Sequence, residues 1–111
     1  MTVSTPILHL TERSLWEAAR ARGTYEMSTR GRNLQEEGFV HCSTRAQLPR
    51  TAAAFYEGVE DLVVLVVDPS RLDVPVKYEA AKRGGEEFPH VYGPIPVAAV
   101  VDVEVWEQAS D

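Results

Sequence analysis

Residues 62 to 67 read LVVLVV and give the strongest structural signal in this chain of 111 residues. Six consecutive apolar residues are far too few to cross a bilayer, which takes about 20 residues in a helix. A short apolar run rich in β-branched valine, with a turn directly after it, is typical of a buried strand. Asp68-Pro69-Ser70 supplies that turn. The sequence therefore predicts a buried strand over residues 62–67.

Upstream of this strand, residues 7 to 23 have the pattern of apolar residues expected of a strand followed by a helix. Ile7-Leu8-His9-Leu10 is a short apolar run that predicts the first strand. Thr11 can cap a helix that follows it, and Gly23 would end that helix. The apolar face of this helix would be formed by Leu15, Trp16, Ala18 and Ala19.

The same pattern occurs a second time between residues 38 and 59. No period holds over 23–37, which we expect to be an exposed loop, whereas 38–42 predicts a strand. Ser43 or Thr44 can cap the next helix, with Pro49 in its first turns. Its core-facing stripe, at helical spacing, is Leu48, Ala52, Phe55, Tyr56 and Val59.

Downstream of the central run, the chain reads mostly as strands. We expect a short strand over 76–79, a polar connection over 82–87, a turn-rich segment over 88–94 and a final long strand over 97–106. Two helices in the N-terminal half followed by strands, without regular strand–helix alternation, predict an α+β fold with a largely antiparallel or mixed sheet. The length fits a single domain spanning residues 1–111.

Composition narrows the class of partners. The formal net charge of −6 argues against broad, salt-driven binding of nucleic acid, which needs a basic face. A local anion pocket stays possible, because most arginines lie in the first half of the chain. No leader pattern is evident in the first ten residues, and the single cysteine, Cys42, excludes an internal disulfide. We therefore expect a cytoplasmic protein without membrane attachment, as a monomer or weak homodimer.

The three histidines, His9, His41 and His90, all lie in short structured segments. Each could be a core or edge histidine whose nitrogens bond to the backbone. Together they could bind zinc, although no short-range ligand pair supports this. A nucleophilic pairing of His41 with Cys42 is disfavoured, because neighbouring residues on a strand point to opposite faces. Cys42 is better placed as a small buried apolar residue.

A helix beginning at Ser43-Thr44-Arg45 suggests a further possibility. Free backbone donors, hydroxyl groups and a guanidinium in one turn are what a phosphate or pyrophosphate binds. Simple capping of the helix would explain the same residues without any ligand.

Several segments resemble a known family. The first-strand histidine in Leu8-His9-Leu10, the string GFVHCST at 38–44, the segments DLVVL at 61–65 and DPSRL at 68–72, VKYE at 76–79 and FPHVYGPI at 88–95 are together similar to the bacterial family called domain of unknown function 952. The resemblance extends from about residue 7 to residue 105. It implies a fold grouped with the ADP-ribosyltransferase-like folds, in which a split, twisted α+β sheet holds NAD.

The resemblance also implies roles for individual residues. His9 would be the first-strand residue that holds a ribose, and His41 the second-strand residue beside the nicotinamide. Glu79 is the obvious carboxylate for steering a ribose hydroxyl, and His90 with Tyr92 could occupy that position instead. A carboxylate stabilises the positive charge that develops when the nicotinamide–ribose bond breaks, and a protonated imidazole does so poorly.

These observations lead to one main expectation about function. The protein would bind a small nucleotide-like ligand, with NAD as a possible substrate, in a histidine-lined cleft. The catalytic candidates are His41, His90 and Glu79. The ligand-binding candidates are His9, Ser43, Thr44, Arg45 and Tyr92. The alternatives are a non-catalytic interaction module with structural histidines, and the three-histidine metal site.

Overall fold

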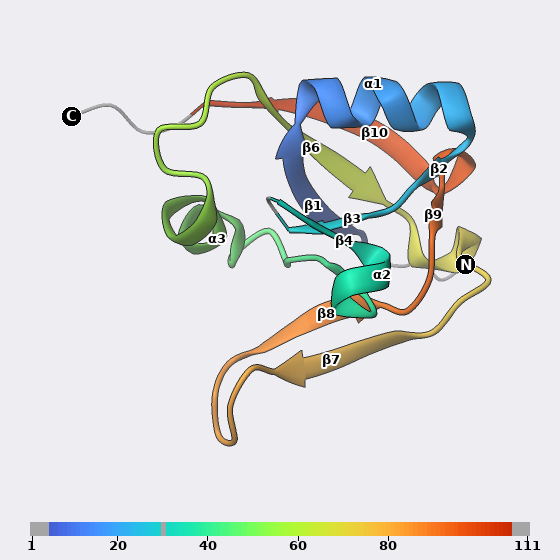
Figure 1. Ribbon diagram of the computed structural model, residues 1–111. Coiled ribbons are helices and arrows are strands. Elements are labelled where there is room, and N and C mark those ends of the chain that lie inside the picture. The colour runs from blue at the N-terminus through green and yellow to red at the C-terminus, as the bar shows by residue number, and fades with distance from the viewer. Residues whose placement is uncertain (1–4, 30, 108–111) are drawn as a thin grey trace.

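The computed structural model describes residues 5–29 and 31–107 of the chain (Figure 1). The longer helices and strands are β1 (Ile7–Glu12), α1 (Arg13–Arg22), α3 (Leu48–Phe55), β6 (Leu62–Val67), β7 (Val76–Ala80), β8 (Glu87–Val91) and β10 (Val100–Trp106). The shorter ones are β2 (Thr24–Tyr25), β3 (Met27–Thr29), β4 (Arg32–Asn33), α2 (Leu34–Glu37), β5 (Val40–His41), η1 (Pro69–Arg71), β9 (Ile95–Pro96) and η2 (Val97–Ala99). This is an α+β fold, as the sequence predicts, and every strand pairing within the described ranges is antiparallel.

The predicted strand over 62–67 is confirmed as β6, and it is the central strand of a three-stranded sheet ordered β1-β6-β10. All six of its residues are buried. Their side chains alternate between two hydrophobic clusters, because successive residues of a strand point to opposite faces. The uninterrupted apolar run is therefore explained by burial on both faces of the strand.

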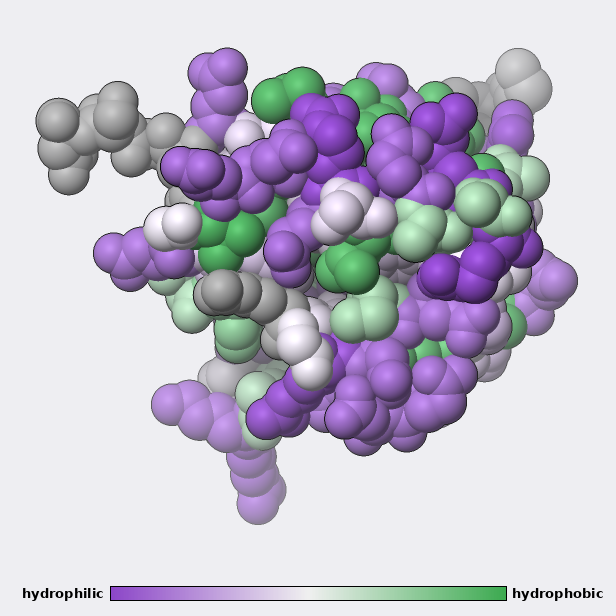
Figure 2. Space-filling model, turned by 45° about the horizontal axis from the view of Figure 1, so that its top comes forward, coloured by the Kyte–Doolittle hydropathy of each residue, from purple (hydrophilic) through white to green (hydrophobic). Residues whose placement is uncertain are grey.

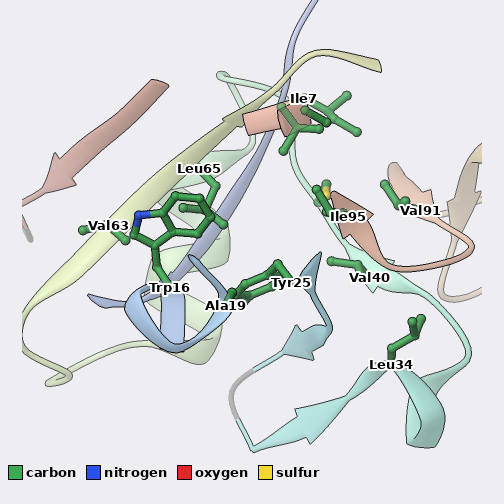
Figure 3. Close-up of a cluster of buried hydrophobic side chains, with 13 residues drawn as sticks. Ile7, Trp16, Ala19, Tyr25, Leu34, Val40, Val63, Leu65, Val91 and Ile95 are labelled. Carbon is green, nitrogen blue, oxygen red and sulfur yellow. The ribbon is translucent and has the colours of Figure 1, made fainter. Parts of the chain in front are cut away.

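The two long helices supply the two clusters on opposite faces of this sheet. Trp16 and Ala19 of α1 pack with Val63 and Leu65, as Figure 3 shows. On the other face, residues of α3 pack with Leu62 and its alternate neighbours in the strand. The two predicted helices are thus confirmed, and each buries one apolar side against the sheet.

A second three-stranded sheet, ordered β5-β8-β7, lies beyond the free edge of β1. An isolated bridge between Leu8 and Ser43 joins the two sheets, with backbone N–H groups donating in both directions at 2.7 and 2.8 Å. Strands β7 and β8 form a hairpin that extends away from the rest of the molecule in Figure 1. Pro89 lies inside β8, where its carbonyl accepts a hydrogen bond from the amide of Cys42.

Several predicted boundaries are wrong. The segment 23–37 is not an irregular loop, because it contains β2, β3, β4 and α2. The first helix begins after Glu12, so Thr11 remains in β1 and does not cap it. Strand β5 covers only 40–41 of the predicted 38–42, because Gly38 adopts a left-handed conformation that ends α2.

Three further expectations need correction. The second helix begins at Leu48 and not at Ser43 or Thr44, because Ser43 continues extended and pairs with Leu8. Residues 87–91 form a strand and not a turn-rich segment, since strands on both sides supply pairing partners. The last strand begins at Val100, after the short 3₁₀ helix η2.

Helix α2 has a complete capping box, which periodicity could not predict in so short a helix. The Asn33 side chain accepts a hydrogen bond from the Glu36 amide at 2.9 Å, and the Glu36 carboxylate accepts one from the Asn33 amide at 3.0 Å. We expect Asn33→Ala to lower the free energy of unfolding by about 1 kcal/mol. Urea denaturation would measure this, with Asn33→Asp as the control that keeps a cap acceptor. An unchanged stability of Asn33→Ala would contradict the capping role.

One face of the molecule is mainly polar. On the face seen in Figure 2, hydrophilic residues predominate and apolar residues occupy small separate areas. Across the described ranges, none of the helices combines the length and the apolar character required to span a bilayer.

Candidate functional site

A cleft of about 830 Å³ opens on the second sheet, within the size range of small-molecule sites. Its walls come from β3 and β4, the segment leading into β5, helix α3 and the β7–β8 hairpin. The lining residues are Thr29, Arg32, Glu37, Phe39, His41, Arg50, Thr51, Ala54, Phe55, Glu79, Ala80, Ala81, Phe88 and His90. Three of the predicted site residues, His41, Glu79 and His90, are therefore brought together here.

Strand register places these side chains on one face of the sheet. His41 is directly opposite His90 in the β5–β8 pairing, and Glu79 is opposite Phe88 in the β7–β8 pairing. Residues 88 and 90 share a face because the side-chain period of a strand is two. The imidazole ring centroids of His41 and His90 are 5.3 Å apart, and His41 lies 5.1 Å from the ring of Phe88.

An aromatic ring stacks on one face of the His90 imidazole. Phe39 stacks on its imidazole with ring centroids 4.0 Å apart and an interplanar angle of 15°. Phe55 approaches His41 from α3 at 6.2 Å, and it is an exposed large hydrophobic residue at 48% accessibility. The cleft is thus bordered by five aromatic or imidazole rings with one partly open face.

Glu79 is the polar anchor of the site. Its Oε1 accepts a hydrogen bond from Nδ1–H of His90 at 3.0 Å and another from the hydroxyl of Tyr92. The hydrogen bond from Tyr92 has the larger effect and the one from His90 the smaller, and together they hold the pKa of the Glu79 carboxyl below its ordinary value. The carboxyl is therefore ionised near neutral pH. The same carboxylate raises the pKa of the Tyr92 hydroxyl. Tyr92 therefore acts on the cleft through Glu79 and does not line it.

The His41 imidazole is neutral at physiological pH. Burial lowers its pKa from 6.5 to about 4, and the neighbouring His90 adds to this effect. A neutral imidazole has one N–H donor and one acceptor nitrogen. Neither ring nitrogen of His41 bonds to a protein group within residues 5–29 and 31–107, so both are available to a ligand.

Among the described residues, Arg32 and Arg50 are the arginines that line the same cleft. Arg32 pairs with Glu37 at 3.3 Å, and Arg50 pairs with Glu86 at 2.7 Å. Both guanidinium side chains are about two thirds exposed, and exposed pairs of this kind stabilise by at most about 1 kcal/mol. An anionic ligand could therefore compete with these carboxylates for the arginines at little cost.

His9 does not belong to the cleft, contrary to the expectation of three histidines in one site. It is only 2% exposed, and its Nδ1–H donates to the His41 carbonyl at 2.7 Å. Its Nε2 lies 2.8 Å from the Tyr25 hydroxyl, which in turn lies 2.7 Å from the Thr11 hydroxyl. Burial lowers the pKa of His9 to about 4. The His9 side chain thus links strand β1 of the first sheet to the backbone of β5 in the second sheet, and it does not line the cleft.

The three-histidine metal alternative loses its basis in this arrangement. Both nitrogens of His9 are already bonded within the protein. Among the described residues, no group of three His, Cys, Asp or Glu side chains is disposed to hold a metal ion. The residues present do not fit a metal of this kind.

The predicted anion site at 43–45 also loses its physical basis, because no helix begins there. Ser43 is buried, and its hydroxyl lies 2.9 Å from that of Thr51. The Thr44 amide donates to the side chain of Gln47. The guanidinium of Arg45 makes a two-pronged contact with Glu104 at 2.6 and 3.0 Å. The side chains of Ser43, Thr44 and Arg45 thus each have a partner inside the protein.

Cys42 is buried in the hydrophobic cluster that also contains Val40 and Val91, as predicted for a small apolar residue. Burial raises the pKa of its thiol, which keeps it protonated and unreactive.

Comparison with known proteins identifies the family. The family model described as a protein of unknown function, DUF952, matches residues 10–103. The chain belongs to the DUF952 family. No match is found among curated proteins.

Solved structures of a protein from Caulobacter crescentus support the same fold. The crystal structure of protein CC0527 from Caulobacter crescentus superposes with a TM-score of 0.82 at 36% identity, covering 96% of this chain and 90% of that one. Its solution NMR structure gives a TM-score of 0.72 at 37% identity, covering 89% and 82%. The DUF952 fold described here is therefore shared with an experimentally determined structure.

Sequence reasoning missed part of this DUF952 cleft. The missed lining residues with chemical interest are Arg32, Phe39, Arg50, Phe55 and Phe88. The apolar stripe predicts a core position for Phe55, yet the helix ends at this residue and leaves it exposed. The alternation of Phe88 and His90 about Pro89 was the one available signal, since it fits a strand with two rings on one face.

Proposed function

We propose that this DUF952 protein binds a nucleotide-type ligand in the cleft, with the base against the aromatic wall and a phosphate toward the arginines. The observation that carries the proposal is the wall of rings contributed by Phe39, His41, Phe88 and His90 around one cavity. Aromatic side chains bind nucleobases by stacking, which contributes about 1–3 kcal/mol for each base. NAD and ADP-ribose are the ligands to test first.

The sheet arrangement is consistent with an ADP-ribosyltransferase-like fold, which we include in the proposal. Two three-stranded antiparallel sheets meet at β1, and the cleft lies on the second of them. In this proposal Glu79 is the carboxylate that binds the ribose and His41 is the residue beside the nicotinamide, which is supported by both residues lining the cleft. His9, in contrast, would act as a buried support for the His41 backbone and would not touch the ribose.

Replacing the ring that covers His90 should weaken nucleotide binding. We expect Phe39→Ala to raise the Kd for NAD or ADP-ribose about tenfold, because one stacking partner is lost. Tyr78→Ala is the matched control, because Tyr78 is an exposed aromatic residue on the opposite face of β7. Chemical-shift titration of the histidine side chains would measure both. Equal Kd values for the two variants, or no saturable shift in the wild type, would overturn the proposal.

The competing function is a non-catalytic interaction module with structural histidines. His41→Ala and His90→Ala distinguish the two. Site histidines are often dispensable for folding, so we expect both variants to melt close to the wild type and to lose nucleotide-induced shifts. Melting well below the wild type, without any ligand effect, would favour the structural role.

A further inference from the structure

The arrangement of Glu79, His90 and Tyr92 has the geometry of an oriented base. Nδ1 of His90 faces a carboxylate oxygen at 3.0 Å. A carboxylate that is ionised can only accept, so Nδ1 of a neutral ring carries the proton. The acceptor lone pair is then on Nε2. Tyr92 donates to the same oxygen and fixes the carboxylate in place.

Nε2 of His90 is available to the cleft. It has no hydrogen-bond partner in the described part of the chain. It is also absent from the buried polar atoms that lack a partner, so it keeps contact with solvent although the residue is 7% exposed. A base must reach the proton that it abstracts, and His90 lines the cleft where a ligand would lie.

The surrounding charges favour one type of electrophile. Arg32 and Arg50 of the cleft stabilise negative charge, which accumulates on phosphoryl oxygens during phosphoryl transfer. They would oppose the positive charge that develops when a glycosidic bond breaks. The carboxylate of Glu79 already accepts two hydrogen bonds, which reduces its capacity to stabilise such a cation. Glu37 also lines the cleft, but its carboxylate is paired with Arg32 at 3.3 Å and an anionic ligand could displace it. The charge pattern therefore favours reaction at phosphorus over reaction at the ribose carbon.

We infer that His90, oriented by Glu79, is a general base for hydrolysis of a phosphodiester bond in a nucleotide-type ligand. A water O–H gives its proton to Nε2, while the water oxygen forms a bond to phosphorus. The bond from phosphorus to the leaving oxygen breaks, and that oxygen takes the electron pair and then the proton from His90. The products are an alcohol and a phosphomonoester. This inference rests on the proposed function and names its substrate class.

The tautomer of His90 can be measured without any substrate. Nitrogen-15 shifts of the neutral ring should show Nδ1–H in the wild type and a mixture of tautomers in Glu79→Gln, because the amide offers both a donor and an acceptor. Tyr78→Phe, on the other face of the sheet, should leave the tautomer unchanged. An Nε2–H tautomer in the wild type would overturn the assignment of the base.

Hydrolysis should be followed with bis(p-nitrophenyl) phosphate and with 2′,3′-cyclic AMP. We expect His90→Gln to lower kcat at least 100-fold with little change in KM, in line with general-base catalysis. Glu79→Gln, a positioning residue, should lower kcat about tenfold and alter the pH profile. Tyr78→Phe should match the wild type. No hydrolysis of either probe by the wild type, or equal rates for wild type and His90→Gln, would overturn the inference.

Binding measured in parallel separates this inference from the proposed function. Saturable nucleotide binding without hydrolysis would refute the inference alone. Hydrolysis of the chromogenic probe without nucleotide binding would refute the proposed function and leave the base in place. Failure of both measurements would refute both.

Discussion

Replacing His9 with alanine should lower the free energy of unfolding by about 3–5 kcal/mol, the largest effect expected of any histidine substitution here. The imidazole is buried and fills space between the two sheets. Its removal leaves the His41 carbonyl without the imidazole donor, and a buried polar group that loses its partner costs about 1–3 kcal/mol. The Tyr25 hydroxyl loses one of its two partners and keeps the Thr11 hydroxyl. The cavity left by the ring adds to this loss.

Equilibrium unfolding in urea would measure the effect. His9→Gln should lose less than His9→Ala, because an amide can keep one of the two hydrogen bonds. Tyr78→Ala, at an exposed position, should change stability by no more than about 0.5 kcal/mol. A His9→Ala variant as stable as this control would contradict the supporting role assigned to His9.

Acidification should begin to destabilise the protein at pH values well above those at which carboxyl groups titrate. The pKa of His9 is about 4 in the folded protein and about 6.5 when unfolded, so the unfolded chain binds the extra proton first. Stability is therefore present above pH 6.5 and is lost as pH falls toward 4. His9 alone should account for about 2 kcal/mol by pH 5 and about 3 kcal/mol by pH 4.

Other groups titrate in the same direction. The pKa of His41 is also lowered to about 4 by burial, so His41 adds to the loss over the same window. The carboxyls with lowered pKa values, Glu26, Asp68, Glu79, Glu86 and Glu104, contribute only below their ordinary pKa. The window between pH 6.5 and 5 is thus dominated by histidine.

Urea unfolding at several pH values would test this dependence. The curve of stability against pH should be shallower for His9→Gln than for the wild type between pH 6.5 and 5, because the titrating group is absent. His41→Gln should flatten the curve separately. Parallel curves for the wild type and His9→Gln would show that the buried imidazole is not the source.

Much of the fold could be predicted from local sequence. The run at 62–67 is β-branched and apolar throughout, and such a run has few ways to satisfy its backbone other than in a buried strand. The helices at 13–22 and 48–55 follow from their apolar stripes. The elements that were missed, β2 to β4 and α2, are two to four residues long, which is too short for a period to emerge.

The site could be predicted only in part, because the residues that flank a histidine in the sequence do not show which distant residues become its neighbours in the fold. His9 and His41 both follow an apolar residue in a strand, yet one is sealed between sheets and the other opens into the cleft. The difference arises because β1 is covered on the relevant face by Tyr25, whereas α3 stops at Phe55 and leaves the ring of His41 accessible.

The sequence by itself determined the α+β class, the buried strand over 62–67, the two long helices, the burial of Cys42 and the chemical identity of His41, Glu79 and His90. Tertiary structure alone decided their grouping. The antiparallel register sets His41 opposite His90 and brings the Glu79 carboxylate to Nδ1 of His90. The bridge between Leu8 and Ser43 keeps Ser43 extended, so the helix expected to begin at Ser43 does not begin at this residue. Strand pairing joins distant segments through backbone hydrogen bonds that carry no side-chain signature, so no local pattern could specify it.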